Sequence, residues 1–283
     1  MGERVIRADS VELATQSFGD PAHPPILLIM GVMASMLWWS DAFCARLAQR
    51  GRHVLRYDNR DTGLSTTYPL GNPAYTSDDM IDDAVRILDG YRIATAHLVG
   101  MSMGGALAQL AALKHPARVA SLTVISSSPV GADTSGLPGP SPAYSAHATQ
   151  HDAIDWTDRA QAIRIQLAES RALAGTAHPF DETGAQRLIE RDVKRARNFA
   201  SATNHLILKE PDRQYRVSDL QAPLLVIHGT ADPLFPIEHG IALSRIVPGA
   251  TMVRLEGGGH ELHEADWDAI VTAVIDHAGR HPA

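Results

Sequence analysis

Four short apolar runs constrain the fold of this chain more than any other feature of its sequence. They occupy residues 26–29, 97–99, 122–125 and 224–227, and Gly, Pro or Asp residues lie close to their ends. Longer segments with helical periodicity separate them. Strands that lack polar alternation are covered on both faces, which is typical of a parallel sheet with crossover helices. The pattern therefore predicts an α/β fold with a mostly parallel central sheet flanked by helices.

The same alternation of short apolar runs and helical segments extends along most of the chain. The strands expected from it are 11–18, 25–30, 53–57, 96–99, 121–126, 223–228 and 251–255. The expected helices are 40–49, 77–88, 103–115 and 265–277. Because strands and helices alternate, successive parallel strands are expected to end at one common edge of the sheet.

The alternation is interrupted between residues 131 and 217. Residues 131–150 are rich in Gly, Pro, Ser and Ala and predict a mobile connection. Two helical stretches, 154–173 and 183–208, follow without a convincing strand. We therefore expect a core formed by residues 1–130 and 218–283, with a helical cap over 131–217 inserted in its second half.

Length, charge and cysteine content exclude several classes of protein. The 283 residues are enough for one large domain with an insertion. A net charge of −7 leaves no basic face for nucleic acid, and the single cysteine, Cys44, excludes an internal disulfide. The N-terminus has no signal-like pattern, and the longest nearly apolar stretch, 26–39, is too short to span a bilayer. We expect a cytoplasmic protein without membrane insertion, and the sequence indicates no particular oligomeric state.

One motif carries the strongest chemical signal. Gly100-Met101-Ser102-Met103-Gly104 stands directly between an expected strand and an expected helix. A serine with glycine two places to each side at such a junction is a nucleophile elbow, in which the tight turn forces the serine out above the sheet. The N-terminus of the helix that follows favours negative charge beside it.

A serine nucleophile needs a base and an acid, and both follow in the chain order typical of this architecture. Asp232 follows the expected strand 223–228, and His260 follows the expected strand 251–255 after three glycines. Both should therefore project from the sheet edge that carries Ser102. Convergence of three separate loops by chance is improbable, so we predict a Ser102–His260–Asp232 triad.

Other carboxylates are weaker candidates for the acid. Asp58 and Asp61 follow a different strand and precede Ser102 in the chain. Asp58 and Arg60 are better explained as groups that tie neighbouring loops together through hydrogen bonds. The loop that starts at Ser126 contains no carboxylate before Pro129, so Asp232 has no competitor there.

Other histidines are expected to be structural. His228 is the last residue of an expected strand, just before the loop that carries Asp232, which we call the acid loop. His97 lies inside a strand. His260 and His263 stand three residues apart, whereas a zinc motif on a helix needs a spacing of four. We therefore expect no metal ion.

Hydrolysis through an acyl-enzyme also requires donors for the oxyanion. The backbone N–H of Met103 is one candidate, and that of Val32, which follows Gly31 after the expected strand 25–30, is the other. The neighbouring apolar side chains line an acyl pocket or belong to the core. They are Met101, Met103, Val32, Met33, Trp38 and Trp39.

Together these residues resemble the α/β-hydrolase superfamily, and more narrowly the aclacinomycin methylesterase-like branch of serine esterases and lipases. The narrower resemblance rests on residues 28–31, 56–65, 99–104, 228–232 and 257–260, and it covers about 5–130 and 218–278. It implies the α/β-hydrolase fold, the triad above, the oxyanion donors Val32 and Met103, and no cofactor.

The sequence departs from the wider superfamily at two positions. Met30 stands where the oxyanion loop usually carries histidine, so we expect this loop to be anchored without an imidazole. Asp61 stands where glycine is common. Both features look like the esterase branch. Dehalogenases and epoxide hydrolases of this superfamily have an aspartate as the nucleophile, so Ser102 argues against both activities.

These residues predict a serine carboxylic ester hydrolase that acts on a small-molecule ester through an acyl-enzyme. A lactonase, a thioesterase or a cofactor-free perhydrolase would use the same triad. From another class, a non-catalytic receptor for a small molecule could share the fold. The presence of all three predicted triad residues argues against a non-catalytic receptor.

Overall fold

The computed structural model describes residues 2–149, 154–209 and 214–283. Its centre is an eight-stranded sheet in the order β1-β2-β4-β3-β5-β6-β7-β8. The strands are β1 (Arg4–Ala8), β2 (Val11–Phe18), β3 (Pro25–Ile29), β4 (His53–Tyr57), β5 (Ala96–Met101), β6 (Val119–Ile125), β7 (Leu224–Gly229) and β8 (Thr251–Leu255). β2 is antiparallel to β1 and to β4. The other six strands, in the sheet order β4-β3-β5-β6-β7-β8, are parallel to one another. The α/β architecture expected from the sequence is confirmed.

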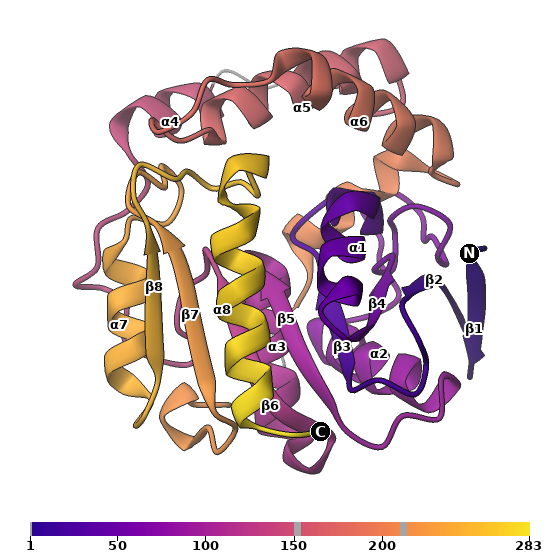
Figure 1. Ribbon diagram of the computed structural model, residues 1–283. Coiled ribbons are helices and arrows are strands. Elements are labelled where there is room, and N and C mark those ends of the chain that lie inside the picture. Colours follow the sequence, from indigo (N-terminus) through magenta and orange to yellow (C-terminus); the bar gives the residue numbers. More distant parts are fainter. Residues whose placement is uncertain (1, 150–153, 210–213) are drawn as a thin grey trace.

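Helices cover both faces of the sheet (Figure 1). α1 (Asp41–Gln49) and α8 (Trp267–Arg280) pack on one face, and α2 (Ser77–Gly90), α3 (Met103–Lys114) and α7 (Glu238–Ile246) pack on the other. Along β3, Ile26 and Leu28 belong to the hydrophobic core on the face covered by α1 and α8. Leu27 and Ile29 belong to the core on the face covered by α2, α3 and α7. This explains the unbroken apolar runs, because each strand presents apolar side chains to two cores. Over the described ranges, no helix combines the length and the apolarity needed to cross a membrane.

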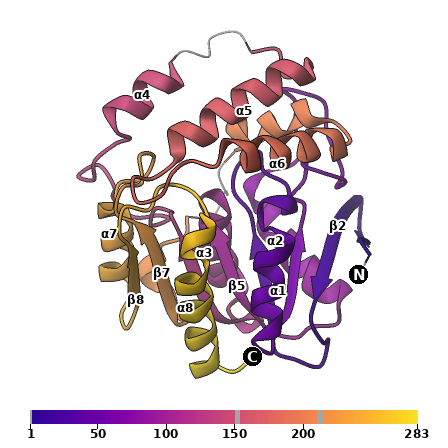
Figure 2. The same cartoon turned by 45° about the horizontal axis from the view of Figure 1, so that its top comes forward.

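A layer of helices lies between β6 and β7 in the chain and over the carboxyl edge of the sheet (Figure 2). It consists of α4 (Pro142–Ala148), α5 (Arg159–Leu173), α6 (Glu182–Arg195) and the 3-10 helix η3 (Phe199–Ile207), and we call these four elements the helical layer. Parts of the expected cap, residues 150–153 and 210–213, lie outside the described residues. The boundaries 131 and 217 stay a prediction.

Two details of the layer differ from the sequence prediction. A helix, α4, forms inside the stretch expected to be a mobile connection, where Ser141 caps the helix and Pro142 occupies its first turn. The single helix expected over 183–208 is broken after Arg195. Asn198 is extended there, and the N–H of Arg197 donates to the carbonyl of Gly63 at 2.8 Å, so a contact with the core replaces a helical hydrogen bond.

β1 and α7 were also missed by the sequence prediction. β1 is a short edge strand in which most side chains are exposed or half-buried, so it lacks the apolar run that marks the inner strands. α7 is only nine residues long and follows the Pro-rich acid loop. Both lie near the lateral edges of the sheet, where local patterns are weakest.

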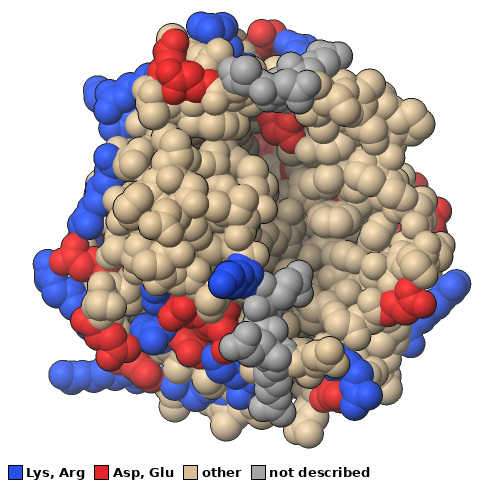
Figure 3. Space-filling view, turned by 180° about the vertical axis from the view of Figure 1, so that it is seen from behind, with Lys and Arg blue, Asp and Glu red and all other residues tan. Residues whose placement is uncertain are grey.

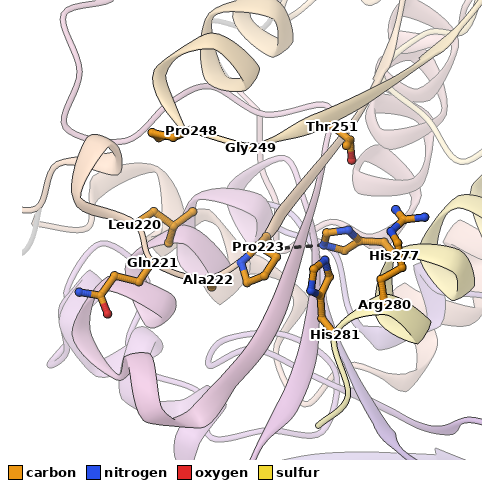
Figure 4. Close-up of a pocket in the computed structure, with 10 residues that line it drawn as sticks. All are labelled: Leu220, Gln221, Ala222, Pro223, Pro248, Gly249, Thr251, His277, Arg280 and His281. Atoms are coloured by element: carbon orange, nitrogen blue, oxygen red, sulfur yellow. Dashed lines mark hydrogen bonds between the residues drawn. The ribbon is translucent and has the colours of Figure 1, made fainter.

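A cavity of about 360 Å³ lies at the opposite edge of the sheet from the carboxyl ends of the strands (Figure 4). Pro223 and Thr251, at the start of β7 and β8, line it together with His277, Arg280 and His281 from the end of α8. Nε2 of His277 donates to the carbonyl of Pro223 at 3.2 Å. The predicted catalytic loops follow the other ends of these strands, so this cavity is separate from them.

Candidate active site

Ser102 occupies a strained turn between β5 and α3. Its backbone has φ of +55° and ψ of −123°, a region that non-glycine residues seldom adopt. A Cβ at Gly100 would lie 2.1 Å from the carbonyl oxygen of Gly104, and one at Gly104 would lie 2.1 Å from that of Ile29. Both flanking glycines are therefore required by close backbone contacts, as expected for a nucleophile elbow.

Asp232 and His260 are joined by a hydrogen bond. Asp232 follows β7 and His260 follows β8, and Nδ1 of His260 lies 2.8 Å from Oδ2 of Asp232. The other carboxylate oxygen, Oδ1, accepts the N–H groups of Leu234 and Phe235 at 2.9 Å each. The carboxylate is thus held on both sides, which fixes the direction in which Oδ2 points.

The environment keeps Asp232 ionised. Burial alone raises the pKa of this carboxyl, but the hydrogen bond and charge of His260, the charge of His228 and the N–H of Phe235 outweigh it, and the net pKa is lowered. An ionised acid is what an imidazole needs when it takes up a proton.

His228 has the structural role that the sequence indicates. Its Nε2 donates to the carbonyl oxygen of Phe235 at 2.7 Å and lies 3.6 Å from Oδ2 of Asp232. The ring is fully buried, and burial lowers its pKa. His228 therefore links the end of β7 to the loop that carries Asp232.

The helical layer contacts both of these loops. The N–H of His260 donates to the carbonyl of Leu173, at the end of α5, at 2.8 Å. The N–H of Ser141, before α4, donates to the carbonyl of Pro233 in the acid loop at 2.8 Å. In the described part of the chain no hydrogen bond joins Ser102 Oγ to His260. The triad roles stay a prediction.

A loop at residues 30–36, which we call the oxyanion loop, lies directly against Ser102. A Cβ added to Gly31 would be 3.2 Å from Cβ and 3.7 Å from Oγ of Ser102. Within the ranges that the structure describes, neither the N–H of Val32 nor that of Met103 donates to an acceptor. Two such free donors beside the serine are compatible with the predicted oxyanion hole, which stays a prediction.

Several side chains hold the oxyanion loop. Nδ2 of Asn59 donates to the carbonyl of Met30 at 3.1 Å, and Oδ1 of Asp58 accepts the N–H of Met36 at 2.9 Å. Between these ends, Nδ1 of His205 accepts the N–H of Met33 at 3.1 Å. The expectation of a loop without an imidazole is therefore wrong, because His205 supplies one from η3. No local motif signals this residue, which lies 172 positions away in the chain.

Asp58 and Arg60 tie loops together, as the sequence predicts. Besides Met36, Asp58 accepts the N–H of Leu64 at 2.9 Å and pairs with Arg195 of α6 at 2.8 Å. Burial raises the pKa of Asp58 to about 6, although Arg195 opposes the shift. Arg60 forms a two-pronged ion pair with Asp83 of α2, with distances of 2.7 and 2.9 Å.

The apolar residues proposed for an acyl pocket divide into two groups. Trp39 is fully buried and stacks on Phe43 of α1, with ring centroids 5.5 Å apart, so it belongs to the core. Met101 is buried in the same core. Val32, Met33, Trp38 and Met103 keep some exposure, and Nε1 of Trp38 donates to Asp192 of α6 at 2.8 Å.

His260 and His263, which stand three residues apart, have separate partners. His263 stacks on His178, with ring centroids 4.5 Å apart, and its Nδ1 accepts the N–H of Ala265 at 3.2 Å. Across residues 2–149, 154–209 and 214–283, no group of three His, Cys, Asp or Glu side chains could hold a metal ion.

Known proteins resemble this chain in sequence and in fold. Residues 24–266 match the family described as alpha/beta hydrolase fold. The chain is 32% identical to rhodomycin D methylesterase of Streptomyces sp. (strain C5), over 98% of both chains. Its structure superposes on an esterase from Rhodococcus sp. ECU1013 with a TM-score of 0.77 at 21% identity, covering 99% of this chain and 100% of that one. An enol-lactonase from Burkholderia xenovorans LB400 gives a TM-score of 0.74 at 22% identity, covering 98% and 100%.

Proposed function

Because the chain belongs to the α/β-hydrolase family, we propose that Ser102, His260 and Asp232 form its catalytic triad and act on a carboxylic ester. The chain is a carboxylic ester hydrolase by its relationship to methylesterases along 98% of its length. The observation that carries the triad is the 2.8 Å hydrogen bond between His260 and Asp232 at the sheet edge that also presents Ser102. Among the described residues, no other carboxylate forms a hydrogen bond or ion pair with the His260 ring.

The residues account for each proton in the reaction. Oγ of Ser102 attacks the ester carbonyl while Nε2 of His260 accepts the hydroxyl proton, and the carbonyl π electrons move onto oxygen. Asp232 holds the Nδ1–H tautomer and stabilises the imidazolium. The tetrahedral intermediate then expels the alcohol, which takes the proton from His260. Water repeats the sequence on the acyl-enzyme and releases the acid and free Ser102.

The oxyanion of both tetrahedral intermediates is proposed to bind to two backbone donors. The N–H of Met103 starts α3, where the helix dipole favours negative charge. The N–H of Val32 is the second proposed donor, because Val32 follows Gly31, where an added Cβ would lie only 3.2 Å from Cβ of Ser102. Each such donor contributes about 3 kcal/mol when it is well placed.

The proposed substrate is a methyl ester of a bulky, uncharged acid. The methylesterase relatives support the leaving group. Figure 3 shows that the face turned away from α1 and α8 is hollowed, and that most of the wall of the hollow is uncharged, with Lys, Arg, Asp and Glu gathered chiefly outside its rim. We propose that residues 131–217 act as a cap that shapes the pocket for the acyl group.

Two assays test this function. Ser102→Ala should lower the turnover of p-nitrophenyl acetate by about 10⁵-fold while the far-UV circular dichroism stays unchanged, because the variant cannot form the acyl-enzyme. Undiminished turnover by the variant would refute the triad. A panel containing the methyl ester of a polycyclic acid, p-nitrophenyl esters of increasing chain length, a lactone and a thioester then tests the substrate. Selective cleavage of the methyl ester is expected, whereas selective cleavage of the lactone or thioester would overturn that assignment.

A further inference from the structure

We propose that His205 is a positioning residue for the oxyanion hole, acting from the helical layer on the loop that presents the N–H of Val32. The proposal rests on the proposed function, since it concerns the same site. Within the described residues, the hydrogen bonds of the His205 ring go to the backbone of Met33 and of Arg60 and not to Ser102. The role of His205 is to set the direction of one backbone donor through a hydrogen bond to the neighbouring peptide.

The imidazole of His205 bridges two loops of the core. Nδ1 accepts the N–H of Met33 at 3.1 Å, and Nε2 donates to the carbonyl oxygen of Arg60 at 2.7 Å. Because a backbone N–H can only donate, Nδ1 must be unprotonated and Nε2 must carry the hydrogen. The residue is only 7% exposed, so both bonds are largely shielded from water. One tautomer in one orientation therefore satisfies both loops.

The peptide that His205 holds is conformationally unusual. Met33 has φ of +60°, in the left-handed region that a methionine seldom adopts. Such a conformation persists only where the surroundings over-determine it. Val32 immediately precedes this residue and follows Gly31, where an added Cβ would lie 3.2 Å from Cβ of Ser102. A change in the Met33 backbone therefore passes directly to the donor proposed for the oxyanion.

Side chains of the core hold the two ends of the oxyanion loop through hydrogen bonds, whereas His205 of the helical layer holds its centre. Asn59 holds Met30 and Asp58 holds Met36, so both ends of the loop are bonded to the segment that follows β4. Within the described residues, the N–H of Met33 in the middle has His205 as its acceptor. Loss of that acceptor should loosen the centre of the loop while its ends stay in place. Catalysis should therefore suffer more than folding.

Isosteric variants separate the two hydrogen bonds. In His205→Asn the amide oxygen can replace Nδ1 as the acceptor for Met33, whereas in His205→Gln the amide nitrogen can replace Nε2 as the donor to Arg60. His205→Leu can do neither. With p-nitrophenyl acetate, we expect kcat of the Leu and Gln variants to fall about 10- to 100-fold and KM to change less than about threefold. The Asn variant should keep kcat within about fivefold of the wild type.

Affinity for a trifluoromethyl ketone gives a readout that a purely structural role would not move. Ser102 adds to this inhibitor, the proton passes to His260, and the resulting oxyanion occupies the hole. Its affinity should fall in the Leu and Gln variants by the same factor as kcat/KM. His277→Leu is the matched control, because His277 is also buried and also donates from Nε2 to a backbone carbonyl, but at the opposite edge of the sheet. It should keep kcat and the inhibitor affinity.

Several outcomes would overturn the proposal. They are equal losses in the Asn and Gln variants, a loss confined to KM, an unchanged inhibitor affinity, or unchanged kcat in both the Leu and Gln variants. If His205→Leu does not fold, the comparison of Asn with Gln decides alone. Ser102→Ala is measured alongside. If that variant keeps full turnover the proposed function fails, whereas if it loses turnover while the His205 variants do not, only the positioning role fails.

Discussion

Replacing Asp232 with asparagine perturbs the triad through a single atom. In the structure Oδ1 accepts two backbone N–H groups, from Leu234 and Phe235, while Oδ2 faces Nδ1 of His260. The amide of Asp232→Asn must keep its oxygen toward the two N–H donors, so its NH₂ group faces the ring. Nδ1 then has to accept, and the ring proton moves to Nε2. His260 in that tautomer cannot take the proton of Ser102.

This tautomer switch sets the size of the expected effect. We expect kcat for p-nitrophenyl acetate to fall about 10⁴-fold, which corresponds to about 5 kcal/mol in the activation free energy. The fold should survive, because the shape of the side chain and the two bonds to Oδ1 are preserved. Rates are measured from release of p-nitrophenol, with thermal unfolding followed by circular dichroism in the same buffer.

A matched control separates the tautomer from the loss of a buried charge. Asp83 is also buried and ion-paired, with Arg60 and Arg86, but it lies on α2. Asp83→Asn should lower the free energy of unfolding by about 3 kcal/mol and leave kcat within about threefold of the wild type. A decrease of less than tenfold in Asp232→Asn, or an equal decrease in kcat in both variants, would refute the reasoning.

Three further predictions concern burial and close packing. Burial raises the pKa of Asp58 to about 6, so between about pH 4 and pH 6 the folded protein holds a proton that the unfolded chain has released. The free energy of unfolding should therefore fall as the pH rises from about 4 to 6. Urea unfolding at several pH values should show this decrease in the wild type and not in Asp58→Asn. Cys44 is fully buried, which raises its pKa to about 12, so iodoacetamide at pH 8 should alkylate it only after urea unfolding, and rapid labelling of the native protein would contradict this. Gly104→Ala should destabilise the fold by about 3 kcal/mol or more because the new Cβ meets the backbone, whereas Gly136→Ala, with open space around it, should change the thermal unfolding midpoint little.

The inner strands and the loops that follow them could be predicted from the sequence because each signal is local. A buried parallel strand is an apolar run, and the residues after it lie at a defined edge of the sheet. Ser102 and Asp232 follow two of these runs within a few residues, and His260 follows the less buried edge strand β8. Their placement therefore needed no knowledge of distant contacts, and the structure places Asp232 and His260 in hydrogen-bonding distance.

The anchoring of the oxyanion loop could not be predicted because it depends on contacts across the chain. His205 reaches Met33 from 172 residues away, and the segment that carries it is part of a break in the helix expected over 183–208. That break itself follows from a bond between Arg197 and Gly63 in the core. Helical periodicity reports the apolar face of a segment, but it carries no information about which loop that face meets.

The most direct test of the triad is the site of covalent labelling by a fluorophosphonate. The reagent transfers its phosphonyl group to the activated serine and releases fluoride, so intact-protein mass spectrometry gives the stoichiometry and peptide mapping gives the residue. We expect one adduct per chain on Ser102, no adduct in Ser102→Ala, and much slower labelling in Asp232→Asn. A wild-type protein that hydrolyses esters yet remains unlabelled, or that carries the adduct on another residue, would contradict the account.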